Sequence, residues 1–404
     1  MAEATDPPRE SFRLSQLLYD ARYRSMTIQV VAAILIMLLL VELVDNTVTN
    51  LAALGKDIRF GFLWSTAGYD INQQLIPFTS QDTHARAAVV GILNTLVVAV
   101  LGCILATIIG VLAGVLRLSS NWLVARIMTF YVEAMRNTPL LIWILIVFAV
   151  MTEATPQPRD FREGGSASLI LWDSVAISNR GVYIPRPIWA EGSMFVVAVF
   201  ILSVIGIFIL RNVARKRQQD TGQILPVFRL SLALFFLPTL LAYFVMGRPV
   251  TLEMPELGGF NFAGGIQIRN SFIALWLALS LYTSAFIAEI VRSGILAVSK
   301  GQTEAAFALG IQPNRTMQLI ILPQALRVII PPLISQYLNL TKNSSLAIAV
   351  GYMDVRSTLG GITINQTGRE LEGMLLLGIF YLITSLIISS AMNFYNSSVK
   401  LKER

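Results

Sequence analysis

Eight separate runs of apolar residues constrain this chain more than any other feature of its sequence. A helix that spans a bilayer needs about 20 mostly apolar residues, and runs that meet or approach this length recur along the whole chain. They lie near residues 26–44, 87–116, 127–151, 193–210, 230–246, 271–291, 328–347 and 373–396. We therefore predict an all-α integral membrane protein with about eight transmembrane helices.

The composition agrees with this fold class. Of the 404 residues, 55% are hydrophobic and only 14% are charged, whereas a soluble domain carries about 25% charged residues. The net charge of +7 is not gathered into a basic block or stripe, so we expect no nucleic-acid partner. Polar Glu42, Asp45 and Asn46 follow the first apolar run, where a signal peptide would have its cleavage site. We expect a retained anchor helix, with "NLAALG" at 50–55 as a weak alternative cleavage region.

The distribution of positive charge predicts the orientation of the chain in the membrane. An even number of spans puts both termini on the same side. If that side is inside, the inner segments hold 18 Lys and Arg in 98 residues, and the outer segments hold 11 in 132. Because Lys and Arg are enriched in cytoplasmic loops, we expect both termini in the cytoplasm. Residues 299–326 then lie in the cytoplasm as well.

The sequence lacks the patterns on which most enzymes depend. Its single cysteine, Cys103, and its single histidine, His84, allow neither an internal disulfide nor a Cys/His metal site. There is no G-x-x-x-x-G-K-[ST] phosphate-binding loop. We expect no catalytic residue, no metal and no cofactor. Energy for any work would come from a separate chain or from an ion gradient.

One semi-polar segment, "GQTEAAFALGIQPNRTMQLIILPQAL" at 301–326, separates two apolar runs. Residues 304–309 form helices readily, Thr303 is placed to cap them, and Gly310 suits the left-handed turn that ends a helix. Small and apolar side chains recur on one face of this helix, at Ala305, Ala308 and Leu309. Such a helix could rest on the membrane surface or could fit closely into a cleft of another protein.

The same segment resembles a known motif. "EAAFALG" followed by "ILPQA" is similar to the EAA loop of ABC-importer permeases, and the matching residues are Glu304, Ala305, Ala306, Gly310, Leu322 and Pro323. Further blocks resemble the polar amino-acid (histidine/glutamine/arginine) branch of that family, in the family's order. These blocks are residues 91–119, 131–144, 285–306 and 342–351.

The resemblance implies a five-helix type I importer core, formed by residues 87–151 and 271–404. Three parts of the chain lie outside that core. They are an N-terminal segment (1–25), an extra first span with its outer loop (26–86) and an insertion with two more spans (152–270). This larger arrangement is similar to permease subunits of general L-amino-acid importers.

The family also implies partners and a mechanism. The chain would be a subunit of an ATP-driven importer for polar or general L-amino acids in a bacterial inner membrane. Its EAA loop, residues 299–326, would be a coupling helix that docks on a cytoplasmic ABC ATPase dimer, where Glu304 could meet a basic residue or cap its own helix. The other partners implied by the family are a related second permease, a periplasmic amino-acid-binding protein and membrane lipid. The alternative is an ion-gradient-driven carrier, for which the core spans offer few acids, Glu133 and Glu289.

Polar residues interrupt the run near 328–347. Gln336, Asn339, Lys342, Asn343 and Ser344 lie in "SQYLNLTKNSSL" at 335–346, the first four of them near one helical face. A charge inside a membrane usually faces a cavity or the interior of a helix bundle. We predict that these residues line the translocation path, with helix packing and a snorkelling Lys342 as the alternative.

Local signals predict further contacts. In "RNTPLL" at 136–141, Asn137 or Thr138 could cap a helix that starts at Pro139, which would break the span at 127–151; alternatively a helix simply begins there. Glu289 and Arg292 are spaced to form an ion pair. Polar Asn94 and Thr95 are expected to bind a neighbouring helix.

Overall fold

The computed structural model of the chain describes residues 21–53, 55 and 58–399, so most of the expected N-terminal segment lies outside this range. Seven helical stretches are long and apolar enough to cross a membrane, or eight if one bent pair counts as a span, which confirms the predicted fold class. The seven are α2 (Ala21–Ala53), α3 (His84–Leu116), α6 (Ser193–Thr221), α7 (Val227–Val245), α8 (Asn270–Leu296), the stretch containing α11 (Leu322–Asn343), and α14 (Glu370–Val399).

The bent pair occupies the expected span at 127–151. Helices α4 (Trp122–Asn137) and α5 (Leu140–Glu153) meet at an angle of 107°. Thr138 is extended, as the residue before a proline tends to be. The break is one of the two alternatives that the sequence left open, but neither of the caps expected for it forms. Pro139 itself is the N-cap residue of α5 and makes no side-chain cap bond, while the Asn137 amide donates back to Glu133 Oε2 at 3.1 Å.

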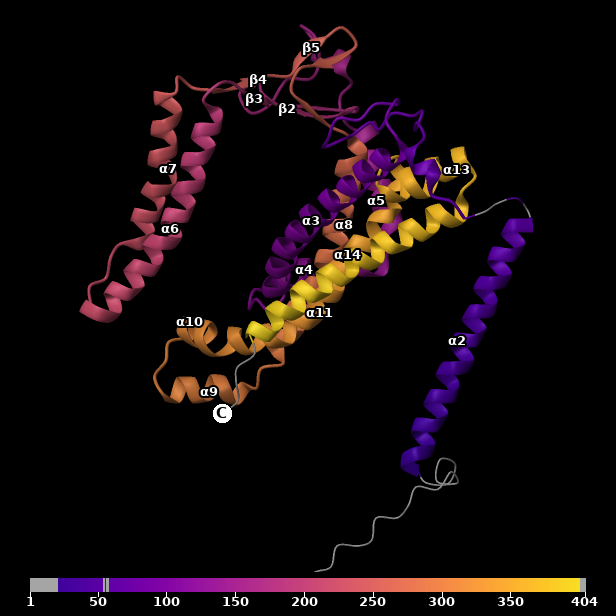
Figure 1. Ribbon diagram of the computed structural model, residues 1–404. Coiled ribbons are helices and arrows are strands. Elements are labelled where there is room, and N and C mark those ends of the chain that lie inside the picture. The colour runs from indigo at the N-terminus through magenta and orange to yellow at the C-terminus, as the bar shows by residue number, and fades with distance from the viewer. Residues whose placement is uncertain (1–20, 54, 56–57, 400–404) are drawn as a thin grey trace, which may run out of the picture.

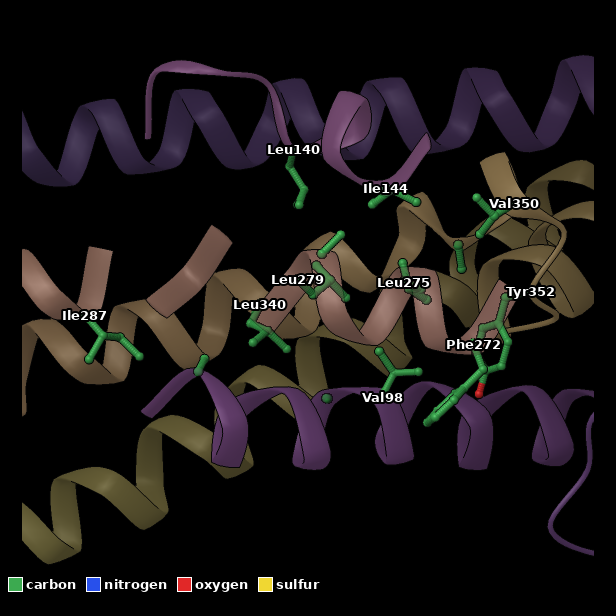
Figure 2. Close-up of a cluster of buried hydrophobic side chains, with 14 of the residues drawn as sticks. Val98, Leu140, Ile144, Phe272, Leu275, Leu279, Ile287, Leu340, Val350 and Tyr352 are labelled. Atoms are coloured by element: carbon green, nitrogen blue, oxygen red, sulfur yellow. The ribbon is translucent and has the colours of Figure 1, made fainter. Parts of the chain in front are cut away.

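Helix α8 lies at the centre of the bundle and packs against α3, α4, α5 and α11. Leu275, Leu279 and Ile287 of α8 are fully buried. Figure 2 shows how side chains from the surrounding helices converge on them, including Val98 of α3 and Leu340 of α11. The core of the protein is therefore built around one helix rather than between two layers.

The contact between α3 and α8 depends on small residues. A Cβ added to Gly110 would lie 2.6 Å from the Cβ of Ile287, and one added to Gly114 would lie 2.6 Å from the carbonyl oxygen of Ala288. These two glycines form a G-x-x-x-G pattern on one face of α3. In lipid, where the hydrophobic effect does not drive helices together, such close approach maximises dispersion contacts.

The insertion at 152–270 contains a helical hairpin and seven short strands. Figure 1 shows α6 and α7 side by side and apart from the helices around α8, with the strands at one end. Strands β1, β2 and β7 form one antiparallel sheet, β3 pairs with β4, and β5 pairs with β6. Their bounds are Ala176–Ser178 (β1), Gly181–Ile184 (β2), Arg186–Trp189 (β3), Val250–Glu253 (β4), Glu256–Gly258 (β5), Asn261–Ala263 (β6) and Ile266–Ile268 (β7).

Short helical turns complete the chain. The segment before α14 is a succession of such turns rather than a loop. The elements are η1 (Gly61–Trp64), η2 (Pro158–Phe161), α9 (Lys300–Ala308), α10 (Pro313–Thr316), η3 (Met317–Ile321), η4 (Ser344–Val350), α12 (Val355–Ser357), η5 (Thr358–Thr363) and α13 (Ile364–Thr367).

The small-residue contact gives a first prediction. Gly114→Leu should destabilise the fold by about 1–3 kcal/mol, because the added side chain has no space against α8. Gly378→Leu is the matched control, since a Cβ at Gly378 meets nothing within 4 Å. Thermal unfolding of the purified protein in mild detergent measures both variants. Equal unfolding midpoints for the two would contradict the proposed packing.

Candidate coupling segment and polar face

The segment between α8 and α11 projects from the bundle as a short helix, a turn and a second short helix. Figure 1 shows α9 and α10 at the end of the molecule opposite the strands. Helix α9 starts at Lys300, about one turn before the predicted start at Glu304, and its N-cap residue is Ser299. The prediction that Thr303 caps the helix is therefore wrong. Glu304 lies inside α9, so it does not cap the helix either.

The end of α9 is as sharp as its sequence predicted. Gly310 adopts a left-handed conformation with φ of +72°. The Gly310 N–H donates to the Phe307 carbonyl at 2.9 Å, and the Ile311 N–H donates to the Ala306 carbonyl at 3.0 Å. This pair of bonds is a Schellman motif, which satisfies the last carbonyl groups of a helix and stops it. Helix α9 is thus a short body with a defined end.

Exposure separates the two sides of α9. Ala306 is only 1% exposed and anchors the helix against the rest of the segment, with which α9 shares contacts at α10 and η3. Glu304 and Ala305 are exposed, and Leu309 is 78% exposed. Glu304 makes no hydrogen bond or ion pair with any residue that the structure describes. The outer surface of α9 therefore combines an unpaired acid with small and apolar side chains.

The segment is tied to the two helices that flank it. Leu322 and Pro323 are exposed at the start of α11, and the next residue, Gln324, donates from Nε2 to Gln302 Oε1 of α9 at 3.3 Å. A Cβ added to Gly294 of α8 would lie 2.3 Å from Ile329 of α11. Helix α9 is thus in contact with the start of α11, which in turn packs closely against the end of α8.

An ion-pair cluster lies close to this end of α8. Arg292 Nη2 donates to Glu289 Oε1 at 2.6 Å, which confirms the predicted pair. The structure adds Arg117, directly after α3, whose Nη1 donates to Glu289 Oε2 at 2.5 Å. Arg117 is separated from Glu289 by too much sequence for a local pattern to reveal the contact. Since both carboxylate oxygens of Glu289 are bound by arginines, this acid is a poor site for a coupling ion.

The polar residues of α11 lie mainly on the side of the helix that the chain leaves uncovered. Asn339 and Lys342 are exposed, and Gln336 and Asn343 are half-buried. None of these four side chains makes a hydrogen bond or ion pair within the described residues. Ser344 differs, because it is buried and its Oγ donates to the Thr341 carbonyl at 2.7 Å. The structure thus brings four of the five predicted path residues together on one face.

Other polar residues hold the end of the bundle opposite α9 and α10. Thr95 Oγ1 accepts from the Val355 N–H of α12 at 3.1 Å and so binds a neighbouring helix as predicted. Asn94 instead donates from Nδ2 at 2.8 Å to the carbonyl groups of Gln73 and Met353, which lie outside helices. Buried Asp354 accepts from the Ser357 N–H at 2.8 Å. Its burial raises the pKa of the carboxyl group to about 6.

Sequence reasoning missed an apolar groove of about 990 Å³ between α3, α11 and α14. Its α11 wall contains Tyr337 and Thr341, which neighbour the polar face, and Tyr337 is hydrogen-bonded to Thr107 of α3 at 2.7 Å. The groove is formed by apolar side chains of three segments that lie far apart in the sequence. In the sequence, an apolar residue that lines a groove cannot be distinguished from one that faces lipid.

A bundle of apolar spans with a protruding, well-terminated segment between two of them is consistent with a membrane permease that a separate protein drives. Comparison with known families supports this class. The model of the family "Binding-protein-dependent transport system inner membrane component" matches residues 216–401, from the end of α6 through α14.

Three relatives are similar over nearly the whole chain. The glutamate/glutamine/aspartate/asparagine transport system permease protein BztB of Rhodobacter capsulatus is 54% identical, with 100% of both chains covered. The general L-amino acid transport system permease protein AapQ of Rhizobium johnstonii is 44% identical over 98% of this chain and 96% of the relative. The putative amino-acid ABC transporter permease protein YhdX of Escherichia coli is 41% identical over 94% of this chain and 95% of the relative.

The chain belongs to the family of binding-protein-dependent ABC permeases. It is a multi-pass inner membrane component of such a system, not its ATPase, and it works with a separate ATPase and a separate binding protein. The family assignment excludes the ion-gradient-driven carrier that the sequence had left as an alternative.

The ion-pair cluster gives a second prediction. Glu289→Gln should destabilise the chain by about 1–3 kcal/mol, because it leaves Arg117, whose side chain is 9% exposed, without its acceptor. Arg292→Gln should cost less than about 1 kcal/mol, since the Arg292 side chain is 32% exposed. Thermal unfolding in detergent compares the two variants, and an equal or larger loss for Arg292→Gln would refute the structural role of Arg117.

Proposed function

We propose that this chain translocates polar L-amino acids in an ATP-driven importer, as the subunit that carries nucleotide-driven motion into the membrane. The observation that carries the proposal is full-length identity of 54% to a permease named for glutamate, glutamine, aspartate and asparagine. The 44% identity to a general L-amino-acid permease supports the same substrate class.

The orientation follows from charge. The turn between α6 and α7 and the α9–α10 segment lie toward the same end in Figure 1, opposite the strands. The inner segments defined above are richer in Lys and Arg than the outer ones, which supports a cytoplasmic location for that end and for both termini. The strands of the insertion then face the periplasm, where the binding protein delivers its substrate.

The division of the chain follows the packing. Residues 87–151 and 271–404 form the permease core around α8, and residues 152–270 are an insertion whose hairpin stands apart from it in Figure 1. The core functions beside a second permease, which we propose is a related chain in a heterodimer. The uncovered polar face of α11 supports this arrangement, because polar side chains at membrane depth need a partner or a water-filled cavity.

Helix α9 is the coupling helix in this account. Its exposed residues Glu304 and Ala305 enter a cleft of the ATPase, and Ala306 and Gly310 hold the helix as a rigid unit. Leu322 and Pro323 start α11 at the other end of the segment and transmit the displacement to the membrane. When ATP closes the ATPase dimer, α9 moves and pulls on the ends of α8 and α11.

The polar face of α11 lines the translocation path. Gln336, Asn339 and Asn343 offer amide groups to a passing amino acid, and Lys342 attracts its carboxylate. Buried Ser344 supports the end of this face by fixing the turn at which α11 passes into η4. All five residues lie on α11 or directly after it, so a displacement of α11 alters the path itself.

The coupling role gives a third prediction. Ala305→Trp should reduce ATP-driven uptake at least tenfold while the assembled complex still hydrolyses ATP, because the bulky side chain prevents close docking of α9. Ala305 is exposed, so the substitution leaves the fold of the chain intact. Gln219→Trp, at an exposed position near the α6–α7 turn, is the matched control. Uptake and ATP hydrolysis are measured on the same purified complex, and unchanged coupling in Ala305→Trp would overturn the assignment of α9.

The path gives a fourth prediction. Lys342→Ala should lower the rate of uptake about tenfold without loss of ATPase association, because it removes the cation from the polar face. Lys342→Arg keeps the charge and should retain most of the activity. Transport kinetics and co-purification are measured for both variants. If Lys342→Ala transports at the normal rate, Lys342 serves packing or snorkelling and not translocation.

A further inference from the structure

A cationic pocket of about 270 Å³ lies at the α6–α7 turn, away from the coupling segment and the polar face. Arg211 and Arg215 are one helical turn apart on α6, so their side chains lie on the same face. Gln218 continues this face, and buried Ala214 leaves room beside it. The residues that line the pocket are Arg211, Ala214, Arg215, Gln218, Leu225 and Val227.

Among the residues that the structure describes, none pairs with the positive charge around this pocket. Residues 211–229 contain five Lys or Arg and a single acid, Asp220. None of these six charged side chains makes an ion pair or side-chain hydrogen bond with a residue that the structure describes. Like charges held this close repel one another, so an anion bound among them would be favoured.

Helix α7 adds a second source of positive potential. Its first residue, Val227, lines the pocket, and its N-cap residue, Pro226, provides no side-chain acceptor. The Val227 N–H already donates to the Leu225 carbonyl at 2.8 Å, but the helix dipole is still positive at this end. Two guanidinium groups and a helix N-terminus therefore face the same small volume, an arrangement that suits a phosphate group.

The surroundings favour a lipid over a free anion. The apolar run of α6 ends at Leu210 and that of α7 begins at Leu230, so the pocket lies where the hairpin leaves the hydrocarbon layer. Apolar Ile224 and Phe228 flank it and are 80% and 78% exposed. A soluble phosphate would gain nothing from these side chains, whereas the acyl chains of a phospholipid would cover them.

We propose that Arg211, Arg215 and the N-terminus of α7 bind the phosphate of an anionic phospholipid headgroup at the membrane surface. Basic pockets between membrane helices are suited to such headgroups. The bound lipid would offset part of the hairpin's positive charge and fix its depth in the bilayer. The site requires only that the α6–α7 hairpin spans the membrane, so it is independent of the roles proposed for α9 and α11.

Native mass spectrometry of the purified full-length chain tests this site, with phosphatidylglycerol and phosphatidylcholine titrated in parallel. Wild-type protein should retain phosphatidylglycerol in preference to phosphatidylcholine. The double variant R211Q/R215Q should bind phosphatidylglycerol about tenfold or more weakly. The matched control K216Q/R217Q removes the same charge from residues outside the pocket and should stay within about twofold of wild type.

Three results would overturn the proposal. Equal weakening in the two double variants would show that net charge alone attracts the lipid. Equal retention of the two lipids by the wild type would show that there is no anionic headgroup site. Displacement of phosphatidylglycerol by millimolar inorganic phosphate would show that the pocket recognises a free anion, without a contribution from the acyl chains.

Discussion

The close contact between α3 and α8 is the interaction on which the rest of this structure depends. Gly110 and Gly114 allow the two backbones to approach, and α8 thereby becomes the buried axis around which α5 and α11 also pack. The same contact brings Arg117 to Glu289. The C-terminal end of α8 is therefore held by an ion pair close to the point where the segment of α9 and α10 begins. The coupling role proposed for α9 requires such a firmly held α8.

A coupling helix transmits motion only if it does not bend. The Schellman motif at Gly310 gives α9 a defined end, and buried Ala306 fixes the helix to the segment behind it. The exposed acid and apolar side chains are left for a partner. In the proposed function, one side of this short helix provides stability and the other binds the partner, which would account for a semi-polar segment in an otherwise apolar sequence.

The sequence predicted what depends on local chemistry. Apolar runs identified the spans because a bilayer requires about 20 such residues, and Gly310 identified the end of α9 because only glycine adopts a left-handed turn without strain. The Glu289–Arg292 pair was predictable because its partners lie one helical turn apart. Arg117 was not, since its contact with Glu289 depends on the tertiary packing of α3. The short strands escaped prediction because three or four residues carry too little alternation to be recognised.

Reconstitution into proteoliposomes, together with the second permease, the ATPase and the binding protein, tests the central claim most directly. The measured quantity is uptake of labelled glutamate and glutamine, with ATP inside the vesicles or with an imposed proton or sodium gradient. The account predicts uptake that requires both ATP and the loaded binding protein and does not respond to a gradient alone. Uptake driven by an ion gradient in the absence of ATP would contradict it.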